Sequence, residues 1–204
     1  MKDPAPLVFI VDDDDAVRHS LRLLLKSVGH TPVTLGSATE FLAQHDPGQP
    51  GCLVLDVRMP QMSGLELQEE LNRRGAVMPV IFITGHGDVP MAVEAMQAGA
   101  FDFLQKPFRD QDLIDRIQRA LERDRDNRAA LGQQGKVRER LDSLTPRERE
   151  VLNLVVLGKP NKIMAADLNV SQRTVEIHRS RVMEKMGANS LAQLVRMMMD
   201  VETS

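Results

Sequence analysis

Short runs of hydrophobic residues recur through the first 105 positions and are separated by longer amphipathic stretches. The runs lie at Leu7–Val11, Pro32–Leu35, Leu53–Leu55, Val80–Ile83 and Phe101–Leu104. Apolar runs of this length that end at turn residues are typical of strands buried on both faces of a sheet. The stretches between them place apolar residues at helical spacing, as at Val17, Leu21 and Leu25.

The same pattern predicts a helix after each strand. We expect helices at Val17–Val28 and Ala38–Gln44, from Gly64 to just before Gly75, at Val89–Gln97, and from Asp110 onward. Five strands that alternate with five helices predict an α/β fold, a doubly wound five-stranded parallel sheet with helices on both faces. This first domain is predicted to span residues 5–122.

Residues 123–142 are rich in Arg, Asp, Glu and Gln, and few of them are apolar. One interpretation is a long charged helix with an interruption near Gly132–Gly135. The other is a helix that ends near Arg128 and continues as a flexible tether. We prefer the helical linker because helix-favouring residues continue throughout.

Residues 143–204 predict an all-α second domain of four helices. Thr145 caps the first helix, Pro146 occupies its first position and Glu148 stands at the capping-box position. The predicted inner face of this helix consists of Val151, Leu152, Leu154, Val155 and Leu157. The later helices are expected at Asn161–Leu168, Gln172–Met186 and Leu191–Met199, with Ser171 capping the third. Two short helices joined by the turn at Asn169 form a helix-turn-helix arrangement.

Composition narrows the classes of protein. Hydrophobic residues make up 42% and charged residues 27%, which argues against disorder, and six Phe with no Trp or Tyr argue against a base-stacking platform. Residues 1–122 carry 11 Lys and Arg against 18 Asp and Glu, a net charge of −7; residues 123–204 carry 15 against 11, a net charge of +4. Only the second half therefore suits a polyanion. Cys52 is expected to be a small buried residue. No membrane-spanning run or signal-peptide pattern is present, so we expect a cytoplasmic protein.

Polar side chains follow four of the predicted strands. They are Asp12 and Asp13 after the first, Asp56 after the third, Thr84 after the fourth and Lys106 after the fifth. Because parallel strands end at one edge of a sheet, these groups are expected to converge there. Converging carboxylates favour a hard cation such as Mg²⁺, and Lys106 and Thr84 suit an incoming phosphoryl group. The pattern indicates metal-assisted phosphoryl transfer onto a carboxylate. Taken singly, Thr84 could be a strand-end cap and Lys106 a surface ion pair.

On the Gln172–Met186 helix, Val175, Val182 and Met186 are predicted to face inward. The outward set is Arg173, Glu176, Ile177, Ser180 and Arg181, and it is flanked by Lys159, Lys162, Arg179 and Lys185. Such a face suits base edges and phosphates of duplex DNA, although in isolation a polar face is more often only solvated.

Four motifs resemble the receiver domain of two-component response regulators, in that family's order and spacing. They are Ile10–Asp13, Leu55–Pro60, Ile83–Gly85 and Lys106–Phe108. The resemblance implies that Asp56 is the phosphoacceptor and that Asp12 and Asp13 form an acidic pocket. It implies Mg²⁺ bound by Asp13, Asp56 and the carbonyl of Arg58, with Lys106 pairing with the phosphoryl oxygens. Thr84 and Phe103 resemble the switch pair that reports phosphorylation to the surface of the fourth helix, fifth strand and fifth helix.

Residues 143–199 resemble the LuxR-type four-helix DNA-binding domain, through Leu144–Leu152, Asn161–Lys162 and Thr174–His178. The whole chain thus resembles the NarL/FixJ class, on its FixJ-like branch. The resemblance implies that Glu176, Ile177 and Ser180 lie nearest the base edges and that Thr174, Arg179 and Arg181 lie at the DNA backbone or at the rim of the groove. It also implies a sensor histidine kinase, promoter DNA, RNA polymerase and a second copy of the chain as partners. His178 is expected to be structural.

Two other classes of function were weighed. A phosphatase with an aspartyl nucleophile would carry a second carboxylate two residues after Asp56, where this chain has Arg58. We therefore expect no enzyme activity beyond the chain's own phosphotransfer and slow dephosphorylation. A protein-interaction adaptor would show no salt-dependent binding to duplex DNA, whereas a DNA-binding regulator would.

Overall fold

The computed structural model of the protein describes residues 4–85 and 89–202. The chain divides into two compact units, Met1–Arg128 and Ala129–Ser204. His86 and Gly87, which come after the predicted fourth strand in the sequence, lie outside the described residues, and so do the last two residues of the predicted second domain. In the described ranges, no helix combines the length and the apolar character that a membrane span needs.

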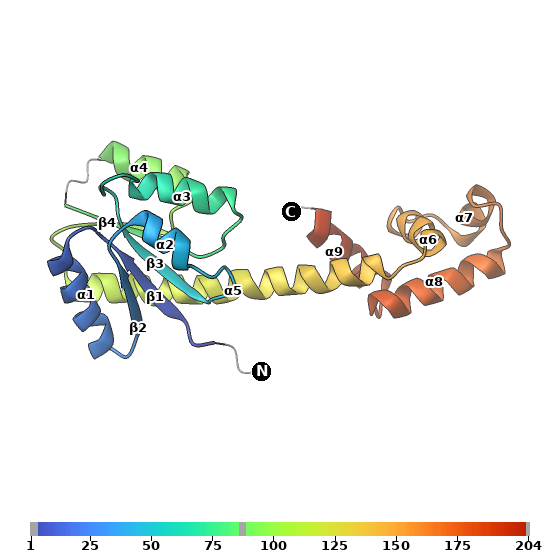
Figure 1. The fold of residues 1–204 in the computed structure, drawn as a ribbon. Helices are drawn as coiled ribbons and strands as arrows, with labels where there is room; N and C mark the ends of the chain where they lie inside the picture. Colours follow the sequence, from blue (N-terminus) through green and yellow to red (C-terminus); the bar gives the residue numbers. More distant parts are fainter. Residues whose placement is uncertain (1–3, 86–88, 203–204) are drawn as a thin grey trace. The chain divides into compact units, whose positions relative to one another are not determined.

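The first unit is a parallel sheet covered by helices, as predicted (Figure 1). Its strands are β1 (Leu7–Val11), β2 (Thr31–Leu35), β3 (Gly51–Asp56), β4 (Val80–Thr84) and β5 (Asp102–Gln105). Its helices are α1 (Asp15–Ser27), α2 (Ala38–Gln44), α3 (Gly64–Arg73), α4 (Val89–Gln97) and the first part of α5 (Asp110–Asp142). The strand order is β2-β1-β3-β4-β5, so the order reverses between β1 and β3, where sheets of this topology bind ligands.

Alternate residues of the strands feed two separate cores. Phe9, Leu53 and Phe82 pack against α2, α3 and α4, the helices that cover one face. Their neighbours in sequence, such as Ile10 after Phe9 and Val54 after Leu53, pack against α1 and α5 on the opposite face. This alternation follows from the two-residue period of a strand. Cys52 is completely buried in the second core, as predicted.

Several helices of the first unit begin where the sequence supplies a cap. The carboxylate of Asp14 accepts the N–H of Ala16 at 2.8 Å. Ser63 and Glu66 form a capping box, in which Oγ of Ser63 accepts the N–H of Glu66 at 3.3 Å and the Glu66 carboxylate accepts the N–H of Ser63 at 2.7 Å. These bonds satisfy N–H groups that the first turn leaves unpaired, so they set where each helix starts.

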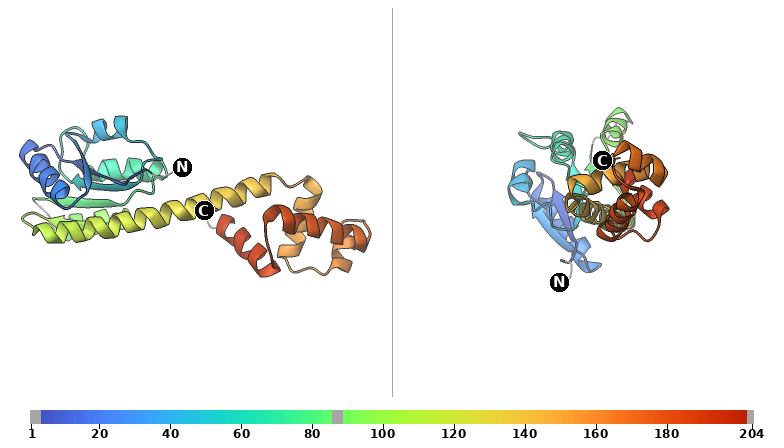
Figure 2. Two further views of the ribbon diagram at one scale, coloured as in Figure 1. Left: turned by 90° about the horizontal axis from the view of Figure 1, so that it is seen from below. Right: turned by 90° about the vertical axis from the view of Figure 1, so that its right-hand side faces the viewer.

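Helix α5 runs from Asp110 to Asp142 without the interruption expected near Gly132–Gly135 (Figure 2). The prediction of a long charged helix is confirmed, and the alternative of a flexible tether is wrong. Two glycines in a helix interior cost about 1 kcal/mol each relative to Ala, which the helix formers around them offset.

The first unit extends along α5 beyond the domain end predicted at residue 122. The carboxylate of Asp124 is buried and accepts the N–H of Gly51 at 2.9 Å and a bond from Nε of Arg128 at 2.9 Å. The guanidinium of Arg128 also donates to the carbonyls of residues 47–49, just before β3. These bonds fasten this part of α5 to the amino edge of the sheet.

The second unit is all-helical, as predicted. It contains the end of α5 together with α6 (Pro146–Val156), α7 (Asn161–Asp167), α8 (Gln172–Met186) and α9 (Leu191–Glu202). Its core includes Val137, Val151, Leu152, Met164, Val175, Val182, Met186 and Leu194. Thr145 forms the predicted capping box with Glu148, and Ser171 caps α8.

Placing Leu157 on the inner face of α6 was wrong, since its side chain is 71% exposed. The residue lies two positions after Val155, which is buried. Two residues turn a helix through about 200°, so Leu157 leaves the buried stripe. It is also the C-cap residue, directly after the end of α6 at Val156. Leu154, which lies between the buried residues Leu152 and Val155, is partly buried.

Candidate functional sites

Asp12, Asp56 and Lys106 meet at the carboxyl edge of the sheet. Nζ of Lys106 donates to Oδ2 of Asp12 at 2.8 Å and to Oδ1 of Asp56 at 3.0 Å. Both carboxylates are almost fully buried, whereas the Lys106 side chain is 23% exposed. The parallel registers pair Val11 with Leu55 and Thr84 with Gln105, so the ends of β1, β3 and β5 lie at one edge of the sheet. Lys106 and Asp12 are therefore in contact although 94 positions separate them in sequence.

The loop after β3 holds the Asp56 carboxylate in place. Its Oδ2 accepts the N–H of Arg58 at 2.8 Å, and the N–H of Gly64 donates to the carbonyl of Val57 at 2.9 Å. A Cβ added at Gly64 would lie 2.3 Å from the carbonyl oxygen of Asp56. The glycine is therefore required by this close approach, whereas sequence reasoning recognised it only as the start of a helix.

The charges at this edge do not balance, because one ammonium faces two carboxylates. Burial raises the pKa of Asp56 above its ordinary value; the hydrogen bond from Lys106 opposes that rise, and the charge of Asp12 adds to it. Burial would lower the pKa of Lys106, but its hydrogen bonds with Asp12 and Asp56 raise the pKa above its usual range overall. The edge thus has an excess of negative charge that a further cation would relieve.

The donor set was tested against the expected Mg²⁺ site. Within residues 4–85 and 89–202, no group of three or more His, Cys, Asp and Glu side chains is placed to hold a metal ion. Asp12 and Asp56 come together, but the side chain of Asp13 is exposed beside them. Two buried carboxylates on one ammonium supply oxygen ligands of the kind Mg²⁺ prefers, and the participation of Asp13 and the Arg58 carbonyl stays a prediction.

Thr84 and Phe103 lie on neighbouring strands near this edge. Thr84 ends β4, is 2% exposed, and its carbonyl accepts the N–H of Lys106 at 2.7 Å. Phe103 is opposite Phe82 in the β4–β5 register and is partly buried against the core that Phe82 belongs to. Their exchange of positions on phosphorylation stays a prediction.

The second candidate site is the outward face of α8. Arg173, Glu176, Ile177, Ser180 and Arg181 are all exposed, as predicted. Val175, Val182 and Met186 are buried, also as predicted. Asn169 adopts a positive φ of 51° in the predicted turn between α7 and α8. The two helices and their turn therefore present a polar face of the kind that contacts DNA.

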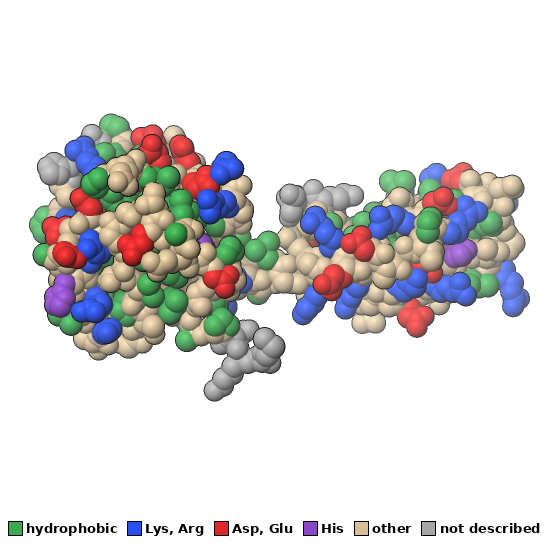
Figure 3. Space-filling model, viewed as in Figure 1, with side chains coloured by type: hydrophobic (Ala, Val, Ile, Leu, Met, Phe, Trp, Pro, Cys, Tyr) green, Lys and Arg blue, Asp and Glu red, His purple; other side chains and the backbone are tan. Residues whose placement is uncertain are grey.

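The residues that flank this face have different surroundings. Lys162 is exposed, and Thr174 is half-buried, with its hydroxyl 2.8 Å from that of Ser171. Nη1 of Arg179 donates to Oδ1 of Asn161 at 2.6 Å, which links α8 to α7. Lys159 pairs with Asp167 at 2.7 Å. Figure 3 shows that Lys and Arg side chains are frequent over this unit on the face it displays.

Lys185 was predicted to hold a phosphate, but its ammonium is engaged within the protein. Nζ of Lys185 donates to Oε2 of Glu148 at 2.7 Å and to the carbonyl of Ser143 at 3.2 Å. Sequence reasoning had identified Glu148 only through its position in the capping box. That the carboxylate also faces Lys185 could not be read from local spacing, since 37 positions separate the two residues.

Two family models match the chain. The response regulator receiver domain matches residues 8–118, and the bacterial regulatory proteins of the luxR family match residues 142–198.

Similar proteins extend over nearly the whole chain. It is 50% identical to nodulation protein W of Bradyrhizobium diazoefficiens over 94% of this chain and 84% of that protein. It is 51% identical to the transcriptional regulatory protein FixJ of Azorhizobium caulinodans, over 93% of this chain and 90% of that protein. The solved low-resolution structure of the response regulator StyR is similar, with a TM-score of 0.82 and 46% identity over 96% of this chain and 99% of that one.

Proposed function

The chain belongs to the NarL/FixJ class of two-component response regulators, with a receiver domain and a LuxR-type DNA-binding domain, and we propose that phosphorylation of Asp56 controls its binding to promoter DNA. The observation that carries the proposal is the placement of the buried Asp56 carboxylate within 3.0 Å of the Lys106 ammonium at the carboxyl edge of the sheet. Relatives named as transcriptional regulators favour this function over a phosphatase or an adaptor.

In the first step, an oxygen of Asp56 attacks the phosphorus of a phosphohistidine on a sensor histidine kinase. The new O–P bond forms as the N–P bond to the kinase histidine breaks, and the histidine leaves with its electron pair. Lys106 stabilises charge on the transferred oxygens. Mg²⁺ bound by Asp13, Asp56 and the carbonyl of Arg58, beside Asp12, would neutralise the remaining excess of negative charge.

In the second step, the added charge of about −2 at Asp56 changes the hydrogen-bonding demand on Thr84. As the Thr84 hydroxyl moves toward the phosphoryl group, Phe103 turns into the space it leaves. This exchange biases the surface of α4, β5 and α5 toward a form that pairs with a second copy of the chain. The dimer then presents two copies of α8 to the DNA.

On DNA, Glu176, Ile177 and Ser180 contact base edges, and the surrounding residues contact phosphates. The phosphate-contacting set is Lys162, Arg173, Thr174, Arg179 and Arg181. From the promoter the dimer contacts RNA polymerase. A regulator that acts on promoters and receives its signal from a kinase works in the cytoplasm.

The first test replaces the phosphoacceptor. Incubation with acetyl phosphate and Mg²⁺ should add one phosphoryl group to the natural chain and none to Asp56→Asn, as measured by intact-protein mass spectrometry. Asp46→Asn changes an exposed aspartate in the loop before β3 and should leave the yield unchanged. An undiminished yield in Asp56→Asn would reject the assignment.

The second test separates base contacts from phosphate contacts. Arg181→Ala should weaken binding about equally across duplex sequences and lower the salt slope by about 0.9 per lost phosphate contact. Glu176→Ala should change the preferred sequence in selection from a randomised duplex library. An unchanged preferred sequence would mean that Glu176 does not contact the bases.

A further inference from the structure

The carboxyl-terminal end of α8 is held by two cations from within the second unit. Lys185 reaches Glu148 of α6 and the carbonyl of Ser143. From the end of α5, Nη1 of Arg140 donates to the carbonyl of Met186 at 2.9 Å. Cations placed at the last carbonyls of a helix interact favourably with its dipole. We call this set of Arg140, Glu148 and Lys185 the helix anchor.

The next residue of the chain, Gly187, accommodates the helix anchor. It ends α8 with a positive φ of 63°, and a Cβ there would lie 3.0 Å from Nη1 of Arg140. The sequence predicts a glycine only from the end of the helix. The structure adds that the Arg140 guanidinium lies against the glycine, so the conformation requires glycine and a Cβ there would press on the guanidinium.

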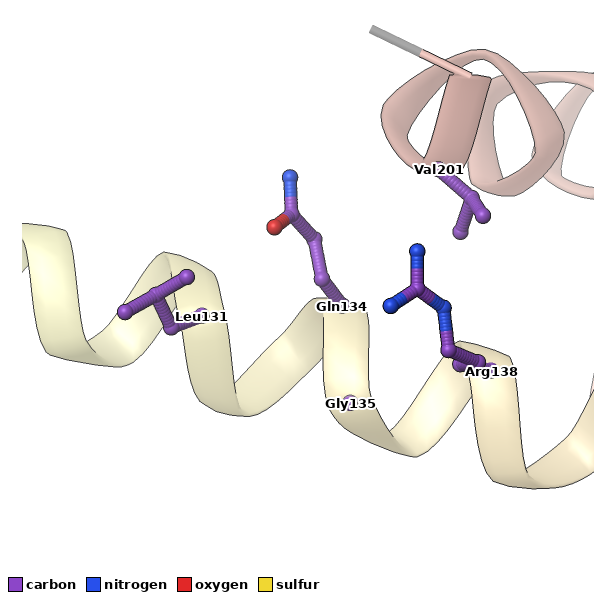
Figure 4. Close-up of a pocket in the computed structure, with 5 residues that line it drawn as sticks. All are labelled: Leu131, Gln134, Gly135, Arg138 and Val201. Atoms are coloured by element: carbon purple, nitrogen blue, oxygen red, sulfur yellow. The ribbon is translucent and has the colours of Figure 1, made fainter. Parts of the chain in front are cut away.

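The end of α5, which carries Arg140, is itself packed into the second unit. Val137 is 2% exposed in the core of the unit. Nε2 of Gln134 donates to the carbonyl of Asp200 in α9 at 3.0 Å. Figure 4 shows Arg138 projecting from α5 toward Val201 of α9, with Gln134 on the same side of α5, beside an open groove of about 260 Å³.

The partner of Lys185 is buried. Glu148 is 2% exposed, and its Oε2 accepts both the Lys185 ammonium and, at 2.9 Å, the N–H of Thr145. Glu148 and Ser143 take two of the three N–H donors of Lys185, and drawing the ammonium onto a DNA phosphate would leave the buried carboxylate without its cation, which is unfavourable. The Lys185 side chain is itself 36% exposed, so the penalty comes from the buried acid, and the exposed Lys162 and Arg181 do not carry it.

We propose that Lys185 and Arg140 are positioning residues, which fix the orientation of α8 for base contact and make no phosphate contact themselves. The proposal rests on the proposed binding of DNA by α8. Loss of the helix anchor lets the end of α8 shift, so base contacts weaken while the number of phosphates neutralised stays the same. Sequence discrimination therefore falls without a change in salt dependence.

The test uses the full chain, phosphorylated with acetyl phosphate, and a duplex selected by the natural chain from a randomised library. Lys185→Met keeps the apolar stem and removes the charge, Glu148→Gln removes the buried charge, and Arg140→Met removes the bond to Met186. Lys162→Met is the matched control, because it removes an exposed proposed phosphate contact. Affinity is measured over a salt series for the selected duplex and for a scrambled one.

For each helix-anchor variant we expect the affinity ratio of selected to scrambled duplex to fall about tenfold, the effect of one poor base contact, with the salt slope unchanged. The double variant Glu148→Gln/Lys185→Met should lose no more than either single variant. Lys162→Met should keep the ratio and lose about 0.9 from the slope. A substitution that only unfolds part of the population would lower both affinities equally and keep the ratio.

Three results would overturn the proposal. A slope lower by about 0.9 in Lys185→Met would make Lys185 a phosphate contact. An unchanged ratio in Glu148→Gln, which has no route to a DNA phosphate, would also contradict it. If the natural chain shows no salt-dependent binding to either duplex, the proposed function fails and the positioning role fails with it.

Discussion

Each unit of the protein holds a lysine against a buried carboxylate, and the two arrangements differ in how charge is compensated. Lys106 in the first unit serves two carboxylates, Asp12 and Asp56, and burial raises the pKa of Asp56. Lys185 in the second unit serves Glu148 alone, and its hydrogen bond, together with the N–H of Thr145, lowers the pKa of Glu148 to about 2. The same pair of residue types therefore yields one strained site and one satisfied site.

The difference lies in the number of positive donors per carboxylate. Asp56 is held where its ionised form is disfavoured, so binding a cation or transferring a phosphoryl group relieves an existing imbalance. The ionised form of Glu148 is favoured, so the pair resists change and suits a structural task. A raised carboxylate pKa, as at Asp56, thus goes with a reactive site, and a lowered one, as at Glu148, goes with a structural ion pair.

The largest expected effect comes from removing the satisfied carboxylate. Glu148→Ala should lower the free energy of unfolding of the second unit by about 2 kcal/mol, because the N–H of Thr145 and the ammonium of Lys185 both lose a charged hydrogen-bond partner. Glu150→Ala, on the same helix, removes an exposed pair with Arg147 and should cost less than about 0.5 kcal/mol. Urea unfolding followed by circular dichroism measures both, and equal losses would erase the contrast between a buried and an exposed pair.

The second prediction concerns pH and follows from the sign of the Glu148 shift. Because the folded state lowers its pKa from 4.5 to about 2, the ionised carboxylate contributes stability that is fully present above pH 4.5. That contribution is lost as the pH falls toward 2. Glu148→Gln should therefore lose less stability over this window than the natural chain does. Parallel stability profiles in thermal melts would show that the lowered pKa does not stabilise the fold.

The smallest predicted effect has the opposite sign and belongs to the strained site. Asp56→Asn should raise the free energy of unfolding of the first unit by about 1 kcal/mol in buffer without Mg²⁺, since it removes a disfavoured buried charge beside Asp12. Asp46→Asn, at an exposed position, should change it by less than about 0.5 kcal/mol. A destabilised Asp56→Asn would mean that Lys106 fully compensates both acids.

Local patterns were enough to predict most elements. The buried runs gave the five strands, since an apolar run with turn residues at its ends leaves little choice of structure. Thr145 and Ser171 marked helix starts because a cap acts on backbone groups two or three residues away. The helical spacing of apolar residues failed at Leu157, which lies beyond the end of α6 and is exposed.

The partners of individual side chains were harder to predict. Convergence of the strand ends on one edge follows from the parallel topology, and Asp12, Asp56 and Lys106 do meet there. The pairing of Lys185 with Glu148 and the attachment of Arg128 to the loop before β3 were not foreseen. Both depend on how helices pack, and the chain carries many other charges that could have served as partners.

The sequence by itself determined most of the secondary structure, the parallel sheet of the first domain and the polar face of α8. These features depend on periodicity and helix caps, which act over a few residues. Only the tertiary structure decided which charges are compensated. Whether a carboxylate is buried, and how many cations reach it, depends on backbone segments brought together from distant parts of the chain. That is why Asp56, the last residue of β3, and Glu148, in the first turn of α6, have pKa shifts of opposite direction.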